Sequence, residues 1–192
     1  MATRAEMSEA RRMSVLRATS ELLDEVGVAA LTIRDVAARA GVAQGTVFLY
    51  AESKADLVNQ VYGQRIADRW HALLDSLADE APLDRVEHFY LGCVDLFYAD
   101  LENVQALYRA LEGHVGRRLA SVDQLLERIR GSLSEASASG ALRDGVDVDV
   151  LALSLQGLYS NVIPLARAGT SHAETQRIIA ESLRQLRRGV GR

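Results

Sequence analysis

The sequence contains very little cysteine and proline, with one cysteine, Cys93, and two prolines among its 192 residues. A single cysteine excludes an internal disulfide framework and any zinc site built on several cysteines, and it fits the reducing conditions of the cytoplasm. No apolar run approaches the ~20 residues that a membrane span needs. The basic N-terminus has no apolar stretch behind it, so no export signal is expected. These absences predict a cytoplasmic protein without a membrane partner.

The scarcity of proline, together with apolar residues at helical spacing throughout, predicts an all-α fold of about nine helices. The net charge of −4 argues mildly against a nucleic-acid binder. Residues 1–70, however, carry nine basic and nine acidic residues, so the acidic excess belongs to residues 71–192. A neutral domain can bind DNA if its cations share one face. The candidates for such a face are Arg4, Arg11, Arg12, Arg34, Arg39 and Lys54.

The most informative stretch is TIRDVAARAGVAQGTVFLYAESK, which runs from Thr32 to Lys54. Its first apolar residues share one helical face: Ile33, Val36, Ala37 and Ala40. Thr32 can cap this helix, and Gly41 can end it and turn the chain. The segment 44–50 is long enough for two turns of a second helix, in which only Val47 and Ala51 look suited to face inward. This pattern indicates a helix-turn-helix, although any helical hairpin with a glycine turn shares its periodicity.

The order T-I-R-D-V-A-A-R-A-G-V-A-Q-G-T-V-F-L-Y, followed by S-K-A-D-L-V, resembles the DNA-binding domain of the TetR family of bacterial regulators. The resemblance covers roughly residues 8 to 62. Ala43 departs from it, because the family usually has a Ser-like helix cap there, and the loss of such a cap costs about 1 kcal/mol. Ala51 stands where a Phe is usual, so we expect thinner packing beneath the second helix. Neither departure removes a group that would face DNA.

The resemblance implies a set of DNA-binding residues: Thr32, Arg34, Gln44, Gly45, Thr46, Phe48, Tyr50 and Lys54. Gln44 and Thr46 would reach base edges, with Arg34 as a further candidate. Thr32, Tyr50 and Lys54 would hold phosphates and fix the register. Phe48 stands where the family usually has a phosphate-bonding Tyr, so it can only pack against sugar or methyl groups.

The remaining helices are expected from caps, periodicity and breaks. The first would run from a Ser8 cap to Val26 with Gly27 as its stop, and it would bury Met13, Leu16, Leu22, Leu23 and Val26. Ser53 and Asp56 form a capping signal for a long fourth helix, 54–78. Further helices are predicted after Pro82, over 101–111, 115–137 and 147–168 with a kink at Pro164, and after Ser171. We expect a DNA-binding domain over 1–56 and a ligand-binding and dimerisation domain over 57–192.

The second domain has a candidate effector site in its aromatic residues. Phe89, Tyr90, Cys93 and Phe97 share one face of the fifth helix, and Tyr108 and Tyr159 could lie across from them. Core packing is the plain alternative, but buried tyrosines bring polar tips that need partners. The apolar positions contain no compact group of charged residues, and a charged ligand would need one once desolvated. The predicted effector is therefore a small, mostly hydrophobic and neutral molecule.

The two C-terminal helices are expected to form a dimer interface through Leu151, Leu155, Leu158, Val162, Ile179 and Leu183, as TetR-like proteins dimerise through this pair. A two-fold dimer would place two recognition helices on a palindromic operator. The prediction is a ligand-responsive transcriptional repressor, with an activator of the same fold as an alternative. An all-α enzyme is unsupported, because the sequence has no nucleophile signature and no Gly-rich phosphate loop. The four histidines lie far apart, so no metal site and no cofactor are expected.

Overall fold

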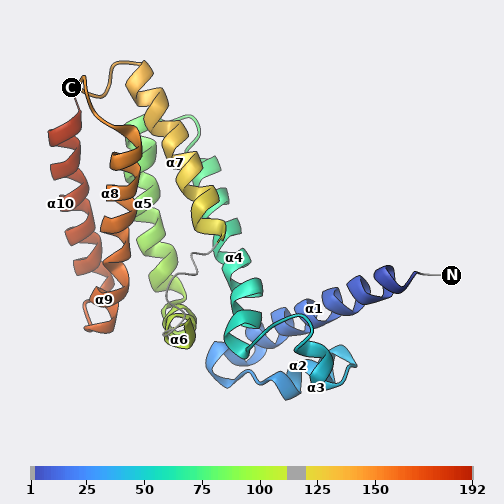
Figure 1. The fold of residues 1–192 in the computed structure, drawn as a ribbon. Coiled ribbons are helices and arrows are strands. Elements are labelled where there is room, and N and C mark those ends of the chain that lie inside the picture. The colour runs from blue at the N-terminus through green and yellow to red at the C-terminus, as the bar shows by residue number, and fades with distance from the viewer. Residues whose placement is uncertain (1–2, 112–119, 192) are drawn as a thin grey trace. The chain divides into compact units, whose positions relative to one another are not determined.

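The computed structural model describes residues 3–111 and 120–191, and within these ranges the chain is helical with no β-strand (Figure 1). Its helices are α1 (Arg4–Ala30), α2 (Ile33–Ala40), α3 (Gln44–Val47), α4 (Lys54–Ser76), α5 (Pro82–Ala99), α6 (Leu101–Leu111), α7 (Ala120–Ala138), α8 (Val148–Ser160), α9 (Val162–Arg167) and α10 (His172–Val190). An isolated antiparallel bridge joins Leu142 and Gly191. The predicted all-α fold is confirmed. The helix expected over 147–168 is divided into α8 and α9, so the structure has one more helix than predicted in that part of the chain.

The described residues form two compact units. The first contains residues 3–66 and 102–111, and the second contains residues 67–101 and 120–191. Helix α4 therefore contributes to both units, and α6 groups with α1 to α3 although it follows α5 in the chain. The domain boundary expected between residues 56 and 57 stays a prediction.

Helix α1 is longer than predicted at both ends. Its N-cap is Thr3 rather than Ser8, because Thr3 and Glu6 form a complete capping box ahead of Ser8. Gly27, with a φ of 72°, interrupts the helix without ending it. The prediction that Met13 and Val26 are buried is wrong: their side chains are 54% and 49% exposed, because the inward face carries Val15, Ala18, Leu22 and Leu23.

Helices α2 and α3 form the predicted helix-turn-helix, with α3 shorter than expected. Gly41 takes the left-handed conformation, with a φ of 68°, and turns the chain between them. Helix α3 ends at Val47, and turns continue to Tyr50. Ala43 makes no side-chain cap hydrogen bond, which leaves this single turn without the support that a Ser would supply. Val47 and Ala51 are both buried, as predicted.

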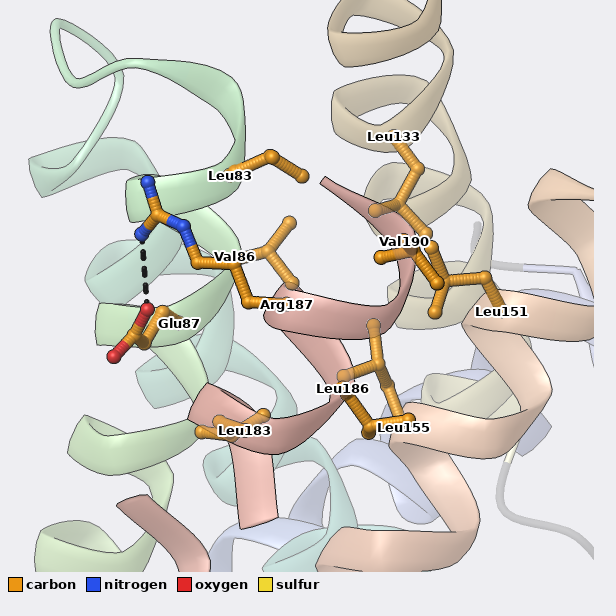
Figure 2. Close-up of a pocket in the computed structure, with 10 residues that line it drawn as sticks. All are labelled: Leu83, Val86, Glu87, Leu133, Leu151, Leu155, Leu183, Leu186, Arg187 and Val190. Atoms are coloured by element: carbon orange, nitrogen blue, oxygen red, sulfur yellow. Dashed lines mark hydrogen bonds and ion pairs between the residues drawn. The ribbon is translucent and has the colours of Figure 1, made fainter. Parts of the chain in front are cut away.

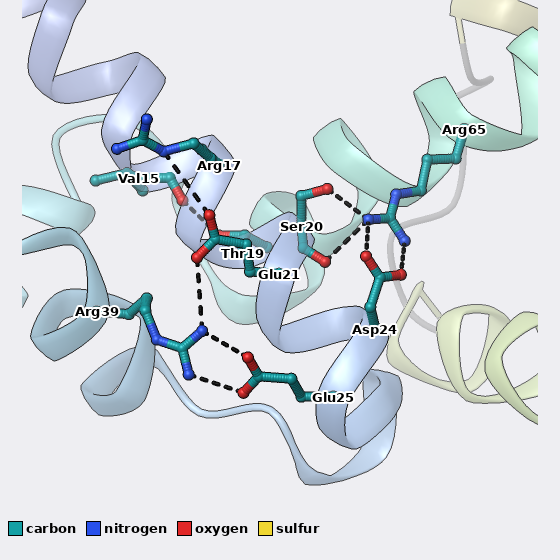
Figure 3. Close-up of polar contacts among 9 residues, drawn as sticks. All are labelled: Val15, Arg17, Thr19, Ser20, Glu21, Asp24, Glu25, Arg39 and Arg65. Carbon is teal, nitrogen blue, oxygen red and sulfur yellow. Dashed lines mark hydrogen bonds and ion pairs between the residues drawn. The ribbon is translucent and has the colours of Figure 1, made fainter.

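Arginines join the neighbouring helices of the first unit to α1 (Figure 3). From α2, Arg39 donates two hydrogen bonds to Glu25, at 2.8 and 2.7 Å, and lies 3.5 Å from Glu21. From α4, Arg65 makes a bidentate pair with Asp24, at 2.6 and 2.9 Å, and also bonds to Ser20. Bidentate pairs of this kind favour one mutual orientation of their partners, so they add to the apolar packing of α2 and α4 on α1.

In the second unit, α5, α7, α8 and α10 run side by side (Figure 1). Helix α5 packs against α7 and α10, and α7 packs against α8. The core residues of these helices include Val86, Phe89, Tyr90, Val94, Leu126, Ile129, Leu133 and Ile179. The expected start of the seventh helix, with Val115 and Leu119, lies outside the described residues.

The break between α8 and α9 falls at Asn161, three residues before Pro164. A proline ring clashes with the carbonyl four residues earlier, here that of Ser160, so the break begins where that clash acts. The segment Val148–Arg167 is long and apolar enough to cross a membrane by length and composition alone, contrary to the expectation that no run would be. Only 22% of its window is buried, so it leaves apolar surface exposed on a single chain.

Two glycines with positive φ provide a test of the contact between α1 and α6. Alanine is strained at both Gly27 and Gly41, but nothing lies within 4 Å of a Cβ at Gly41. A Cβ at Gly27 would lie 2.9 Å from Asn103 Oδ1, and that oxygen accepts the Val28 N–H at 2.9 Å. We expect Gly41→Ala to lower the free energy of unfolding by about 1 kcal/mol and Gly27→Ala by roughly 1 kcal/mol more. Urea titration measures both, and equal losses would show that the Asn103 contact contributes nothing.

Candidate DNA-binding surface and effector site

The outward face of the α3 segment follows from what it buries. With about 3.6 residues per turn, the side opposite buried Val47 and Ala51 carries Gly45 and Leu49. The exposures agree, since Gly45 is exposed and Leu49 is 77% exposed. Gln44 and Phe48 lie along one flank and both are exposed, Phe48 by 52%. Thr46 and Tyr50, which lie along the other flank, are half-buried. The surface thus has an apolar ridge between flanks that differ in exposure.

Lys54 lies at the start of α4, beside backbone N–H groups that suit an anion. The predicted cap of this helix is confirmed, because Ser53 Oγ accepts a hydrogen bond from the Asp56 N–H at 3.1 Å. Lys54 Nζ donates to the Ala29 carbonyl at 3.0 Å, which leaves two of its three protons for other acceptors. Partial burial lowers the pKa of this amine. The position is compatible with a phosphate contact.

Two hydroxyls that were predicted to hold phosphates have partners within the chain. Tyr50 Oη donates to the Ser8 carbonyl at 3.1 Å, so its one proton is already used. Thr32 Oγ1 donates to Asp35 Oδ2 at 2.6 Å and accepts from the Asp35 N–H at 3.2 Å. A phosphate contact from either hydroxyl would have to replace the hydrogen bond that it now donates.

The cations that were candidates for a DNA-facing group differ in the ion pairs that they make within the chain. Arg39 was proposed for a DNA-facing group, but its guanidinium is held by Glu25 and Glu21, and the same hydrogen bonds lower the pKa of Glu25. Its place in that group stays a prediction. Arg12 pairs with Glu9 at 3.3 Å. The Arg34 side chain is 80% exposed and lies 3.8 Å from Asp35, a contact that solvent screens strongly.

Several of the predicted effector-site residues come together inside the second unit. The ring centroids of Tyr90 and Tyr159 lie 6.0 Å apart, and Phe89 lies edge-on to Tyr90 at 5.4 Å. Tyr159 Oη donates to the Cys93 carbonyl at 3.3 Å. Trp70, which was not predicted, joins through an edge contact with Tyr159 at 6.5 Å. We call Trp70, Phe89, Tyr90, Cys93 and Tyr159 the aromatic cluster.

Two uncharged side chains of this unit have a buried polar atom that makes no hydrogen bond with the described residues. One is the Tyr90 hydroxyl, within the aromatic cluster, and the other is Gln156 Oε1, on α8 three residues before Tyr159. Burial raises the pKa values of Tyr90 and Cys93, so both groups are neutral near pH 7. Sequence reasoning missed Gln156, although an amide within an otherwise apolar helix was a visible signal.

The other predicted effector residues lie elsewhere. Phe97 is buried on α5 and makes an edge contact with Tyr98 at 5.7 Å. Tyr108 lies on α6, which belongs to the first unit, and burial raises its pKa. Figure 2 shows a separate apolar cavity of about 30 Å³, which is lined from α5, α7, α8 and α10 and in which Arg187 pairs with Glu87 at 3.0 Å. A cavity of this size holds about one water molecule, so it is too small for an effector.

Most of the residues predicted for the dimer interface are buried within their own chain. These are Leu151, Leu155, Val162, Ile179 and Leu183, and Leu158 is half-buried. Packing against the helices of the same unit accounts for their periodicity in the single chain, and the dimer interface expected from these residues stays a prediction. The outward side of α8 instead carries Val150 (58% exposed), Leu153 (44% exposed) and Gly157, spaced at i, i+3 and i+7.

Among the described residues, no three His, Cys, Asp or Glu side chains are grouped so that they could hold a metal ion.

The chain matches the model of the family described as "Bacterial regulatory proteins, tetR family" over residues 15–61. This match covers α2, α3 and the parts of α1 and α4 that pack with them.

Relatives with assigned functions extend the match beyond this segment. The HTH-type transcriptional repressor BepR of Brucella suis is 26% identical over 130 residues, which is 65% of this chain and 61% of that protein. The fatty acid metabolism regulator protein of Bacillus subtilis is 24% identical over 152 residues, 71% of this chain and 73% of its own. Both are named as regulators.

A solved structure of RolR in complex with resorcinol has the same fold as this chain. It superposes with a TM-score of 0.70 at 20% identity and covers 98% of this chain and 91% of its own. With the helix-turn-helix and the family match, residues 15–61 are therefore a DNA-binding domain of the TetR family of bacterial regulatory proteins.

Proposed function

We propose that the protein is a ligand-responsive transcriptional repressor, which binds a palindromic operator as a homodimer and is released by a small, mostly apolar and neutral effector. The observation that carries this proposal is the exposed face of α3, opposite buried Val47 and Ala51. A helix held by one side, with the other side free, can enter the major groove. The Brucella relative is itself named a repressor, which favours repression over activation.

The DNA contacts divide into base and phosphate groups. Gln44 is exposed on a flank of α3 and suits adenine, and Arg34 is exposed on α2 and suits guanine. Lys54, with two free protons, is the strongest phosphate candidate. Thr32 and Tyr50 would contribute only after exchanging an internal hydrogen bond for a phosphate.

The homodimer would form through the outward side of α8. Val150 and Leu153 leave apolar side chains in water, and Gly157 on the same side has nothing within 4 Å of the place for a Cβ. Such a side lets a second helix approach closely and cover the apolar residues. This arrangement would also account for the low burial of Val148–Arg167 in one chain.

The effector would bind at the aromatic cluster. A buried hydroxyl or amide without a hydrogen bond costs about 1–3 kcal/mol. A ligand that forms hydrogen bonds with Tyr90 Oη and Gln156 Oε1 would remove this cost, which would contribute to its binding free energy. Gln156 Oε1 can only accept, which requires a hydroxyl or N–H group on the effector. The effector class is therefore an apolar, largely aromatic or aliphatic molecule with at least one hydrogen-bond donor.

Release from DNA requires that the effector binds two states of the protein with different affinity. Helix α4 runs without a break from Lys54, in the first unit, to Ser76, in the second. A shift of its second half, which carries Trp70 of the aromatic cluster, would move Lys54 as well. The spacing of two recognition helices in a dimer would then change.

The DNA-binding part is tested with an operator selected from random duplexes. Lys54→Ala should weaken binding to operator and random DNA alike and reduce the slope of log K against log salt by about 0.9, the value of one phosphate. Lys54→Arg, which keeps the charge, is the control. Gln44→Ala should relax the preference at one or two operator positions, at ~1–3 kcal/mol each. Equal losses on operator and random DNA for Gln44→Ala would remove it from base readout.

The dimer is tested by placing a charge on the outward side of α8. Leu153→Glu should give a folded monomer that no longer binds the operator tightly, because a buried carboxylate without a partner is strongly unfavourable. Gln124→Glu makes the same change of charge on the exposed side of α7 and should remain a dimer. Sedimentation velocity at micromolar concentration distinguishes them. A wild-type monomer, or a dimeric Leu153→Glu, would contradict this interface.

The effector site is tested with two matched tyrosine variants. Tyr90→Phe removes a hydroxyl that lacks a partner, so the free energy of unfolding should stay constant or rise by about 1 kcal/mol, while effector binding weakens. Tyr159→Phe removes a hydroxyl that donates to the Cys93 carbonyl, so this variant should have a free energy of unfolding about 1 kcal/mol lower than the wild type. Resorcinol, the ligand of the RolR structure, is a suitable first probe. Equal destabilisation of both variants would show that the Tyr90 hydroxyl already has a partner.

A further inference from the structure

Leu49 has the most exposed large apolar side chain on the proposed DNA-reading surface. It is 77% exposed, and neighbouring Phe48 is 52% exposed. Hydrogen bonds from the Phe48 N–H to Gln44 O, at 3.4 Å, and from the Leu49 N–H to Thr46 O, at 3.2 Å, keep this part of the chain coiled beyond α3. Leu49 therefore lies in a tight turn that continues from α3, and its side chain is exposed whereas that of Val47 is buried.

The residue one turn before Leu49 on the same ridge is Gly45, which has no side chain. Nothing lies within 4 Å of the place that a Cβ at Gly45 would occupy. A flat partner can therefore come close to the backbone at Gly45, and Leu49 is then the side chain that reaches furthest into that partner.

An apolar side chain at this place limits what it can recognise. The edges of base pairs in the major groove present hydrogen-bond donors and acceptors, and their one apolar group is the C5-methyl of thymine. Leucine cannot form hydrogen bonds with the polar edges, and burial against them would desolvate those edges without compensation. Contact with a methyl group removes apolar surface from water on both sides.

We propose that Leu49 is a specificity-determining residue that contacts the C5-methyl group of a thymine in each operator half-site. This inference rests on the proposed DNA binding and adds a base that none of the polar candidates would read. Gln44 lies on the neighbouring flank and would read an adjacent base pair. The exposed side chain of Phe48, the preceding residue, would shield the methyl contact from water.

The test removes one methyl group at a time from the DNA. Each thymine of the selected operator is replaced by deoxyuridine, which keeps every hydrogen-bonding group of the base. For the wild-type protein, one replacement in a single half-site should weaken binding about threefold to fivefold, as expected for the loss of one buried methyl, and the same replacement in both half-sites about ninefold to 25-fold. Leu49→Ala should bind the thymine operator more weakly and should not distinguish it from the deoxyuridine operator at that position.

The controls separate this inference from the function on which it rests. Val26→Ala shortens another exposed apolar side chain of the same unit and should keep the full discrimination. Circular dichroism and the melting temperature check that Leu49→Ala is folded, and Leu49→Met, which keeps an apolar side chain, should retain part of the discrimination. If the wild-type protein prefers no DNA sequence, both the proposed function and this inference are wrong. If it binds an operator but no deoxyuridine replacement matters, or Leu49→Ala discriminates as the wild type does, only this inference is overturned.

Discussion

The DNA-binding unit depends on how α2 is held against α1. An isolated helix shorter than ~12 residues is marginal in water, and α3 has a single turn without a side-chain cap. Its position therefore comes from outside itself, through the left-handed turn at Gly41 and the burial of Val47 and Ala51. That turn is placed by α2, which buries Val36 and Ala37 and is tied to α1 by the Arg39–Glu25 pair. Arg39, a candidate for the DNA-facing group of cations, thus ties α2 to α1 in this structure.

Much of the fold could be predicted from spacing and caps, because these are local properties of the chain. The helix-turn-helix, the Ser53 cap and the inward residues of the α3 segment all follow from residues a few positions apart. Periodicity also identified Leu151, Leu155 and Val162 as one covered side of a helix. It could not say what covers them, since a partner chain and a neighbouring helix impose the same pattern. The structure assigns that side to the chain's own core.

In the candidate effector site, too, the local pattern could be predicted from the sequence and the tertiary contacts could not. The α5 part of the aromatic cluster is a local stripe and was predicted, whereas Trp70 and Tyr159 come from α4 and α8 and join it only through tertiary packing. Whether a buried polar atom is satisfied depends on every helix around it. Sequence alone could place Tyr90 in the stripe but could not reveal that its hydroxyl lacks a partner while that of Tyr159 has one.

Lys54 carries the only side-chain amine in the sequence. Because partial burial lowers its pKa, a larger fraction of this amine is neutral and nucleophilic than in an ordinary surface lysine. A reagent that acylates lysine side chains therefore has one target in this chain, at the start of α4. The same modification would remove a positive charge from the proposed phosphate-binding surface, so chemical labelling and loss of DNA affinity should proceed together.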